Sequence, residues 1–125
     1  MSKVIVIDDE PFILMMIEDK LRMGGIGVTT LRESKKALSV IKEVGPDLVI
    51  LDWMMPELSG VDLCRAMKAD PELKDIPVIL LTAKGQDADK KLGLSCGAAM
   101  FVTKPFSPKA LLDTVNSVLN RKHDA

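Results

Sequence analysis

Five short runs of apolar and β-branched residues recur along this chain, and longer segments with helical patterns separate them. The runs cover residues 4–7, 27–31, 48–51, 78–81 and 99–103. Their length and residue types predict five β-strands. The first, third and fourth runs are apolar almost throughout instead of alternating with polar residues. This pattern is typical of parallel strands that crossover helices bury on both faces.

The segments between and after these runs predict five helices. They cover residues 11–23, 34–44, 60–70, 87–95 and 108–120. The first and the last carry apolar residues at the spacing of an amphipathic helix. Asp9 ahead of Pro11, and Ser107 ahead of Pro108, each fit an N-cap close to a first-turn proline. The segment 87–95 is more polar, so we expect the least stable helix there.

Regular alternation of strands and helices predicts an α/β fold with a doubly wound, five-stranded parallel sheet and five helices. We expect the flavodoxin-like strand order 2-1-3-4-5. A chain of 125 residues fits one ordinary domain, so a single domain over residues 1–125 is predicted.

Charge and composition exclude several classes of function. The net charge is −1, from 17 basic and 18 acidic residues, and no basic cluster exists that could follow a phosphate backbone. Direct nucleic-acid binding is therefore not expected. The opening apolar run stops after four residues, too short for a signal peptide or a membrane span, which favours a cytoplasmic protein without membrane contact. Cys64 and Cys96 have no metal-ligand or CxxC spacing, and we expect reduced, half-buried side chains.

Polar residues stand directly at the ends of four of the predicted strands. They are Asp8 with Asp9, Asp52, Thr82, and Lys104 ahead of Pro105. Ligands of doubly wound sheets bind outside the carboxyl ends of the strands, and the order 2-1-3-4-5 would gather the three carboxylates into one pocket. Crowded carboxylates either acquire raised pKa values or are neutralised by a cation. Oxygen ligands of this kind favour Mg²⁺.

The same residue types fit phosphoryl transfer, which depends on positioning and charge compensation. Asp52 at the centre of the sheet is the candidate nucleophile, because a carboxylate can attack phosphorus to give an acyl phosphate. Lys104 offers a positive charge and Thr82 a hydroxyl donor. Taken singly, each has an ordinary alternative: Asp8 and Asp9 a helix cap, Asp52 a turn, Thr82 a bond to local backbone, Lys104 a solvated lysine. Their coincidence favours the site.

Four short motifs occur in a recognisable order and at recognisable separations. They are Asp8-Asp9, Asp52-Trp53-Met54-Met55-Pro56, Thr82-Ala83 and Lys104-Pro105-Phe106. Together they resemble the receiver domain of bacterial two-component response regulators, of the stand-alone type. The resemblance implies a phosphorylation switch, in which Asp52 accepts a phosphoryl group from a histidine kinase or a histidine phosphotransfer protein. Such a protein catalyses only its own phosphorylation and dephosphorylation and is not a conventional enzyme.

The resemblance also assigns roles within the site. Asp9, Asp52 and the backbone carbonyl of Met54 would hold Mg²⁺, or Mn²⁺ in its place, while Asp8 would act through water. Thr82, the backbone of Ala83 and Lys104 would bind the phosphoryl oxygens. Thr82 and Phe101 would form the switch, and the Lys104–Pro105 bond would be cis.

The resemblance further implies a downstream protein effector, bound through the fourth helix, fifth strand and fifth helix, and a monomer or phosphorylation-dependent dimer. Two other functions remain as alternatives. A Mg²⁺-dependent phosphatase of the haloacid dehalogenase-like group also uses an aspartyl nucleophile, although such enzymes carry Asp-x-Asp and a cap. The other is an interaction module that is never phosphorylated. Trp53, beside the candidate acceptor, is expected to be partly exposed.

Overall fold

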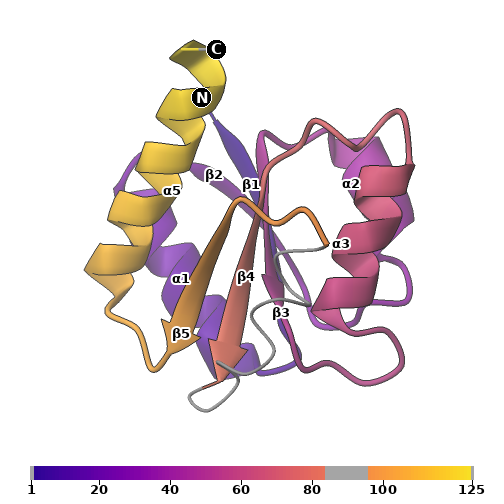
Figure 1. Cartoon of the computed structure of the whole chain (residues 1–125). Coiled ribbons are helices and arrows are strands. Elements are labelled where there is room, and N and C mark those ends of the chain that lie inside the picture. The colour runs from indigo at the N-terminus through magenta and orange to yellow at the C-terminus, as the bar shows by residue number, and fades with distance from the viewer. Residues whose placement is uncertain (1, 84–95, 125) are drawn as a thin grey trace.

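The computed structural model describes residues 2–83 and 96–124. Its five strands are β1 (Lys3–Ile7), β2 (Gly27–Leu31), β3 (Leu48–Asp52), β4 (Val78–Ala83) and β5 (Met100–Lys104). All neighbouring strands pair in parallel, and their order in the sheet is β2-β1-β3-β4-β5 (Figure 1). The predicted α/β class and strand order are therefore confirmed.

The described residues include helices α1 (Pro11–Met23), α2 (Ala37–Val44), α3 (Gly60–Ala69) and α5 (Pro108–Asp124). In Figure 1, α1 and α5 cover one face of the sheet, and α2 and α3 cover the other. The helix predicted over residues 87–95 lies outside the described residues. Among the helices that the structure describes, none has the length and hydropathy that crossing a membrane requires.

The sheet separates two apolar cores, one under each pair of helices. Ile5, Leu51 and Leu80 point into the core beneath α2 and α3, and Val6 and Ile50 point into the core beneath α1 and α5. Every side chain of β3 is buried. Full burial of one such aliphatic side chain contributes about 1.5–3 kcal/mol to folding. The central strands are thus fixed firmly, and with them the residues that follow their ends.

Two helix starts were predicted with the same pattern, and only one has the predicted cap. The hydroxyl of Ser107 accepts the N–H of Ala110 at 3.3 Å, as expected of an N-cap. The prediction that Asp9 caps α1 is wrong, because the cap position is Glu10 and its side chain makes no capping bond. The Asp8 carboxylate instead accepts the N–H of Glu10 at 2.9 Å. Asp9 is therefore not used in capping.

The second helix starts later than predicted, and the cysteines lie deeper. α2 begins at Ala37 because a turn precedes it, in which the Ala37 N–H donates to the Ser34 carbonyl at 3.1 Å. Cys64 and Cys96 are free, but they are buried completely and not half-buried as expected. Both belong to the core beneath α2 and α3.

Gly60, the first residue of α3, lies against the backbone of the strand that carries Asp52. Its N–H donates to the Trp53 carbonyl at 2.9 Å. A Cβ at this position would collide with the Asp52 carbonyl oxygen, and it would lie 2.9 Å from the Asp52 carbonyl carbon and 3.1 Å from Trp53 Cα. Only glycine therefore allows α3 to start so close to the end of β3.

The Gly60→Ala substitution should destabilise the protein by about 3 kcal/mol, because the added methyl group meets backbone that cannot move without displacing β3. The free energy of unfolding in urea measures this loss. Gly24→Ala is the matched control, since there the added Cβ comes within 2.9 Å of the flexible end of Leu112, while the nearest backbone atom, the Leu21 carbonyl oxygen, lies at an ordinary contact distance of 3.4 Å. Equal losses for the two variants would contradict the close-approach explanation.

Candidate functional site

Four strands end at the same edge of the sheet and bring polar side chains together there. Asp8, directly after β1, is fully buried, and Asp52 at the end of β3 is 5% exposed. Thr82, near the end of β4, is also buried. Lys104 closes β5, and 19% of its side chain is exposed. The strand order thus brings these four residues to the same edge of the sheet.

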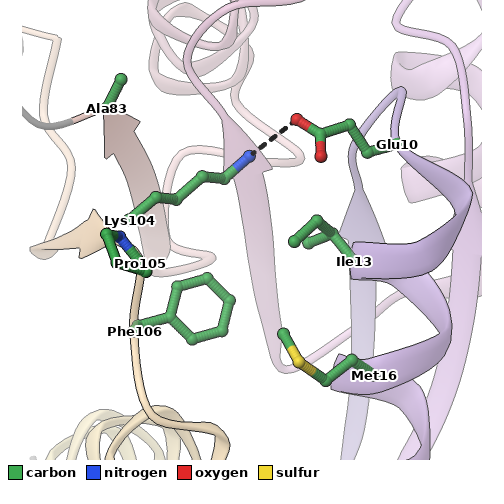
Figure 2. Close-up of a pocket in the computed structure, with 7 residues that line it drawn as sticks. All are labelled: Glu10, Ile13, Met16, Ala83, Lys104, Pro105 and Phe106. Carbon is green, nitrogen blue, oxygen red and sulfur yellow. Dashed lines mark ion pairs between the residues drawn. The ribbon is translucent and has the colours of Figure 1, made fainter.

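The ammonium group of Lys104 lies between the acidic side chains. Its Nζ is 3.0 Å from Asp8 Oδ2 and 3.3 Å from Asp52 Oδ1. A third and longer ion pair of 3.9 Å joins it to Glu10 Oε1 (Figure 2). Since β5 is an edge strand and β4 separates it from β3, the lysine side chain reaches past β4 to contact both carboxylates.

These contacts decide the charge state of the site. Burial, together with the negative charges of Asp8 and Asp9, raises the pKa of Asp52 to about 6, although Lys104 offsets part of the rise. Burial alone would lower the pKa of Lys104. The hydrogen bond to Asp8 and the charges of both carboxylates outweigh burial and leave the pKa of Lys104 above its ordinary value. Lys104 therefore stays protonated, while Asp52 becomes fully ionised only above neutral pH or with further compensation.

Three neighbouring acids form a group that could hold a metal ion. One carboxylate oxygen from each of Asp8, Asp9 and Glu10 lies within 4.8 Å of the others. Oxygen-only donors of this kind fit a hard divalent cation such as Mg²⁺. Asp52 is not part of this group, and its carboxylate is held at Lys104 instead. Sequence reasoning missed Glu10, although an acidic residue directly after two candidate ligands was a usable signal.

The remaining predicted site residues surround this centre. Ala83 is the last residue of β4 and is exposed. Phe101 is half-buried on β5, opposite Leu80 of β4, and packs against the core beneath α2 and α3. Met54, two residues after Asp52, has 64% of its surface exposed. The Lys104–Pro105 peptide bond is cis, as predicted.

Trp53 is buried, with 6% exposure, so the expectation of partial exposure is wrong. Its N–H donates to the Leu81 carbonyl at 2.9 Å, and its own carbonyl accepts the N–H of Gly60. These bonds extend the pairing of β3 by one residue, and the ring enters the core beneath α2 and α3. The sequence placed this residue in a loop because it follows the acid that ends the apolar run.

A pocket of about 420 Å³ opens beside Lys104, between α1 and the segment after β5. Ile13 and Met16 of α1 form one wall, and Pro105 and Phe106 form the other (Figure 2). Glu10 and Lys104 lie at its rim in Figure 2. A molecule that contacts Lys104 from this side would therefore also meet apolar surface.

The arrangement of the strand ends agrees with a comparison against known families. Residues 4–116 match the model of the response regulator receiver domain. The chain belongs to this family. Receiver domains are signalling modules of two-component systems and not conventional enzymes. They receive their signal from histidine kinases, and they generally use Mg²⁺.

The chain is similar in sequence to the receiver regions of curated response regulators. It is 42% identical over 118 residues to the phosphate regulon transcriptional regulatory protein PhoB of Pseudomonas aeruginosa, covering 94% of this chain and 52% of PhoB. It is 38% identical to the DNA-binding response regulator MtrA of Mycolicibacterium smegmatis, covering 98% and 53%. The chain thus spans about half the length of these curated relatives.

Solved structures give the same result. A putative response regulator from Chloroflexus aurantiacus superimposes with a TM-score of 0.90 at 31% identity, covering 95% of this chain and 98% of the other. The chemotaxis response regulator CheY4 of Vibrio cholerae gives a TM-score of 0.88 at 30% identity, with 94% and 98% covered. The receiver fold therefore extends over nearly the whole chain.

The raised pKa of Asp52 predicts a pH-dependent effect of Asp52→Asn when divalent metal is chelated. The protonated carboxyl of Asp52 stabilises the fold relative to the ionised form. This contribution is complete below the ordinary pKa of 3.8, which applies in the unfolded chain, and it is lost as the pH rises through the pKa of about 6 in the folded protein. Asparagine lacks this ionisation. At pH 7 the variant should therefore exceed wild type in unfolding free energy by about 2 kcal/mol.

Urea unfolding of both proteins with a chelator, at several values between pH 4 and 7, measures this gap. The gap should widen as the pH rises. Asp19→Asn, on an exposed position of α1, is the control and should show no widening. A wild type more stable than Asp52→Asn at pH 7 would contradict the assigned charge repulsion.

Proposed function

We propose that residues 1–125 form one receiver domain that is switched by phosphorylation of Asp52. The observation that carries the proposal is the position of the Lys104 ammonium group, 3.0 Å from Asp8 and 3.3 Å from Asp52. It brings a nearly buried carboxylate, a fixed cation and neighbouring acids to one edge of a rigid sheet. This combination provides a nucleophile and compensation for the negative charge that arrives with a phosphoryl group.

In the proposed reaction, an oxygen of the Asp52 carboxylate attacks the phosphorus of a phosphohistidine on a histidine kinase or a histidine phosphotransfer protein. The phosphorus–nitrogen bond breaks, the imidazole leaves and is protonated, and an acyl phosphate forms on Asp52. Lys104 then exchanges part of its pairing with Asp52 for a phosphoryl oxygen. The Thr82 hydroxyl and the backbone N–H of Ala83 donate to the other phosphoryl oxygens.

The donor set fits Mg²⁺, with Mn²⁺ as a substitute. Asp9, Asp52 and the Met54 carbonyl would be direct ligands, Asp8 would act through water, and Glu10 is added by its place in the acidic group. When bound, the ion supplies positive charge that lowers the repulsion between carboxylates and phosphoryl oxygens. Asp52 would then be ionised at neutral pH and ready to attack.

The phosphorylated domain signals through a change in partner binding. We assign the switch to Thr82 and to Phe101, whose half-buried ring can turn inward when the threonine is drawn toward the phosphate. The contact surface includes β5 and α5, together with the helix predicted over residues 87–95. The partner is a protein effector, and direct nucleic-acid or membrane contact is not part of the proposal. We infer a cytoplasmic protein that is monomeric or dimerises on phosphorylation.

Incubation with acetyl phosphate and Mg²⁺ tests the acceptor. Intact-mass analysis should show a gain of one phosphate on wild type and none on Asp52→Asn, because asparagine cannot form the acyl phosphate. Omission of Mg²⁺ should abolish the gain on wild type. A phosphate-sized gain on both proteins would remove Asp52 from its role, and steady release of phosphate from a simple ester would favour the phosphatase instead.

The exposed Met54 is expected to affect how long the acyl phosphate persists. It follows Asp52 by two positions and is exposed, so we place its side chain beside the path of the hydrolytic water, where asparagine would hold a water by hydrogen bonds. Met54→Asn should therefore change the rate of hydrolysis several-fold, measured as phosphate release from phosphorylated protein. Met23→Asn, at the far end of α1 and 80% exposed, is the control. Equal decay rates for wild type and Met54→Asn would exclude this role.

A further inference from the structure

The fold brings the two cysteines of the chain together, although 32 positions separate them. Cys64 lies on the inner face of α3 and is 0% exposed, and Cys96 lies in the turn ahead of β5 and is 2% exposed. Cys64 Sγ contacts the carbonyl oxygen of Cys96 at 3.4 Å. The phosphorylation mechanism uses neither residue. The two thiols therefore form a second cluster of side chains with their own chemistry, apart from the phosphorylation site.

Both side chains belong to the core beneath α2 and α3. Burial, with the neighbouring Cys96 as the next contribution, raises the pKa of the Cys64 thiol to about 12, against smaller opposing charges from Lys68 and Arg65. The 3.4 Å contact of Cys64 Sγ with the Cys96 carbonyl oxygen brings the Cys64 sulfur directly against the Cys96 residue. At neutral pH Cys64 is a thiol and not the reactive thiolate, so reaction waits for a local opening.

The two cysteines differ in how readily such an opening exposes them. Cys64 is held inside a helix, with neighbours on α3 that are themselves buried. Cys96 lies in a turn and is followed by Gly97, which is exposed and has a φ of +90°. Turns open at lower free energy than packed helices. Cys96 is therefore the first sulfur that a reagent in solution can reach.

We propose that Cys64 and Cys96 are a modification site. They form an intramolecular disulfide with each other when they react with a low-molecular-weight disulfide such as oxidised glutathione. The Cys96 thiolate attacks one sulfur of the reagent, the reagent's disulfide bond breaks, and one glutathione leaves as a thiolate that takes up a proton. The Cys64 thiolate then attacks the Cys96 sulfur and releases the second glutathione. Two protein thiols are oxidised, and one glutathione disulfide is reduced to two thiols.

The bond would join α3 to the start of β5, at the end of the sheet opposite the carboxylates. Lys104 and Thr82 lie at the other ends of β5 and β4. The bridge should therefore leave phosphorylation of Asp52 unchanged. It should also raise the urea midpoint of unfolding, because it closes a long loop in the unfolded chain.

The test treats the native 125-residue protein with excess oxidised glutathione, blocks remaining thiols and measures intact mass. Wild type should lose two hydrogen atoms, and a digest should contain a peptide in which Cys64 is linked to Cys96. Cys64→Ser should stop at an adduct of one glutathione on Cys96. Cys96→Ser should react at least tenfold more slowly, because its remaining thiol lies inside the helix.

Four results would overturn the proposal. They are stable glutathione adducts on wild type, disulfide-linked dimers, an oxidised form with a lower urea midpoint than the reduced form, and no reaction of native wild type while denatured protein reacts. Asp52→Asn should form the bridge as readily as wild type. Failure of the cysteine proposal can therefore be distinguished from failure of the phosphorylation proposal.

Discussion

The contact of one ammonium group with two buried carboxylates is the constraint on which the rest of this structure depends. An unpaired charge in such surroundings costs several kcal/mol, so neither Asp8 nor Asp52 could be buried as deeply without Lys104. Lys104 comes from the edge of the sheet and the carboxylates from its centre. The ion pairs thus tie β5 to β1 and β3, across β4. Compensation remains incomplete, which is why Asp52 keeps a raised pKa and a readiness to bind further positive charge.

The fold was predictable because its signals are local and repeated. Each apolar run corresponds to a strand, and the ends of the strands specified where polar residues would meet. The errors share a different cause. The burial of Trp53 depends on Gly60 and Leu81, and the position of Cys96 depends on α3, contacts that are distant in sequence. Such contacts exist only once the sheet has assembled, so no pattern near these residues could indicate them.

The site was predictable in its members and less so in its geometry. The adjacent aspartates suggested a helix cap, a metal site or both, whereas Asp8 both accepts a backbone N–H and pairs with Lys104. Asp9 is therefore not needed as a helix cap, and its carboxylate lies with those of Asp8 and Glu10 in one acidic group. Sequence spacing cannot distinguish which of three consecutive acids points inward, because that depends on how the first turn of α1 meets the lysine from β5.

The distance along the chain between Asp8 and Lys104 has a consequence for biosynthesis. The lysine follows the first aspartate by 96 positions, and its strand occupies an edge of the sheet. A nascent polypeptide emerges from the ribosome with the acids first, and domains generally fold in that order. A partly made chain therefore holds its carboxylates without their cation and keeps them near water. Only addition of the last strand supplies this cation, so Asp8 reaches its final, buried and paired state only after β5 has been made.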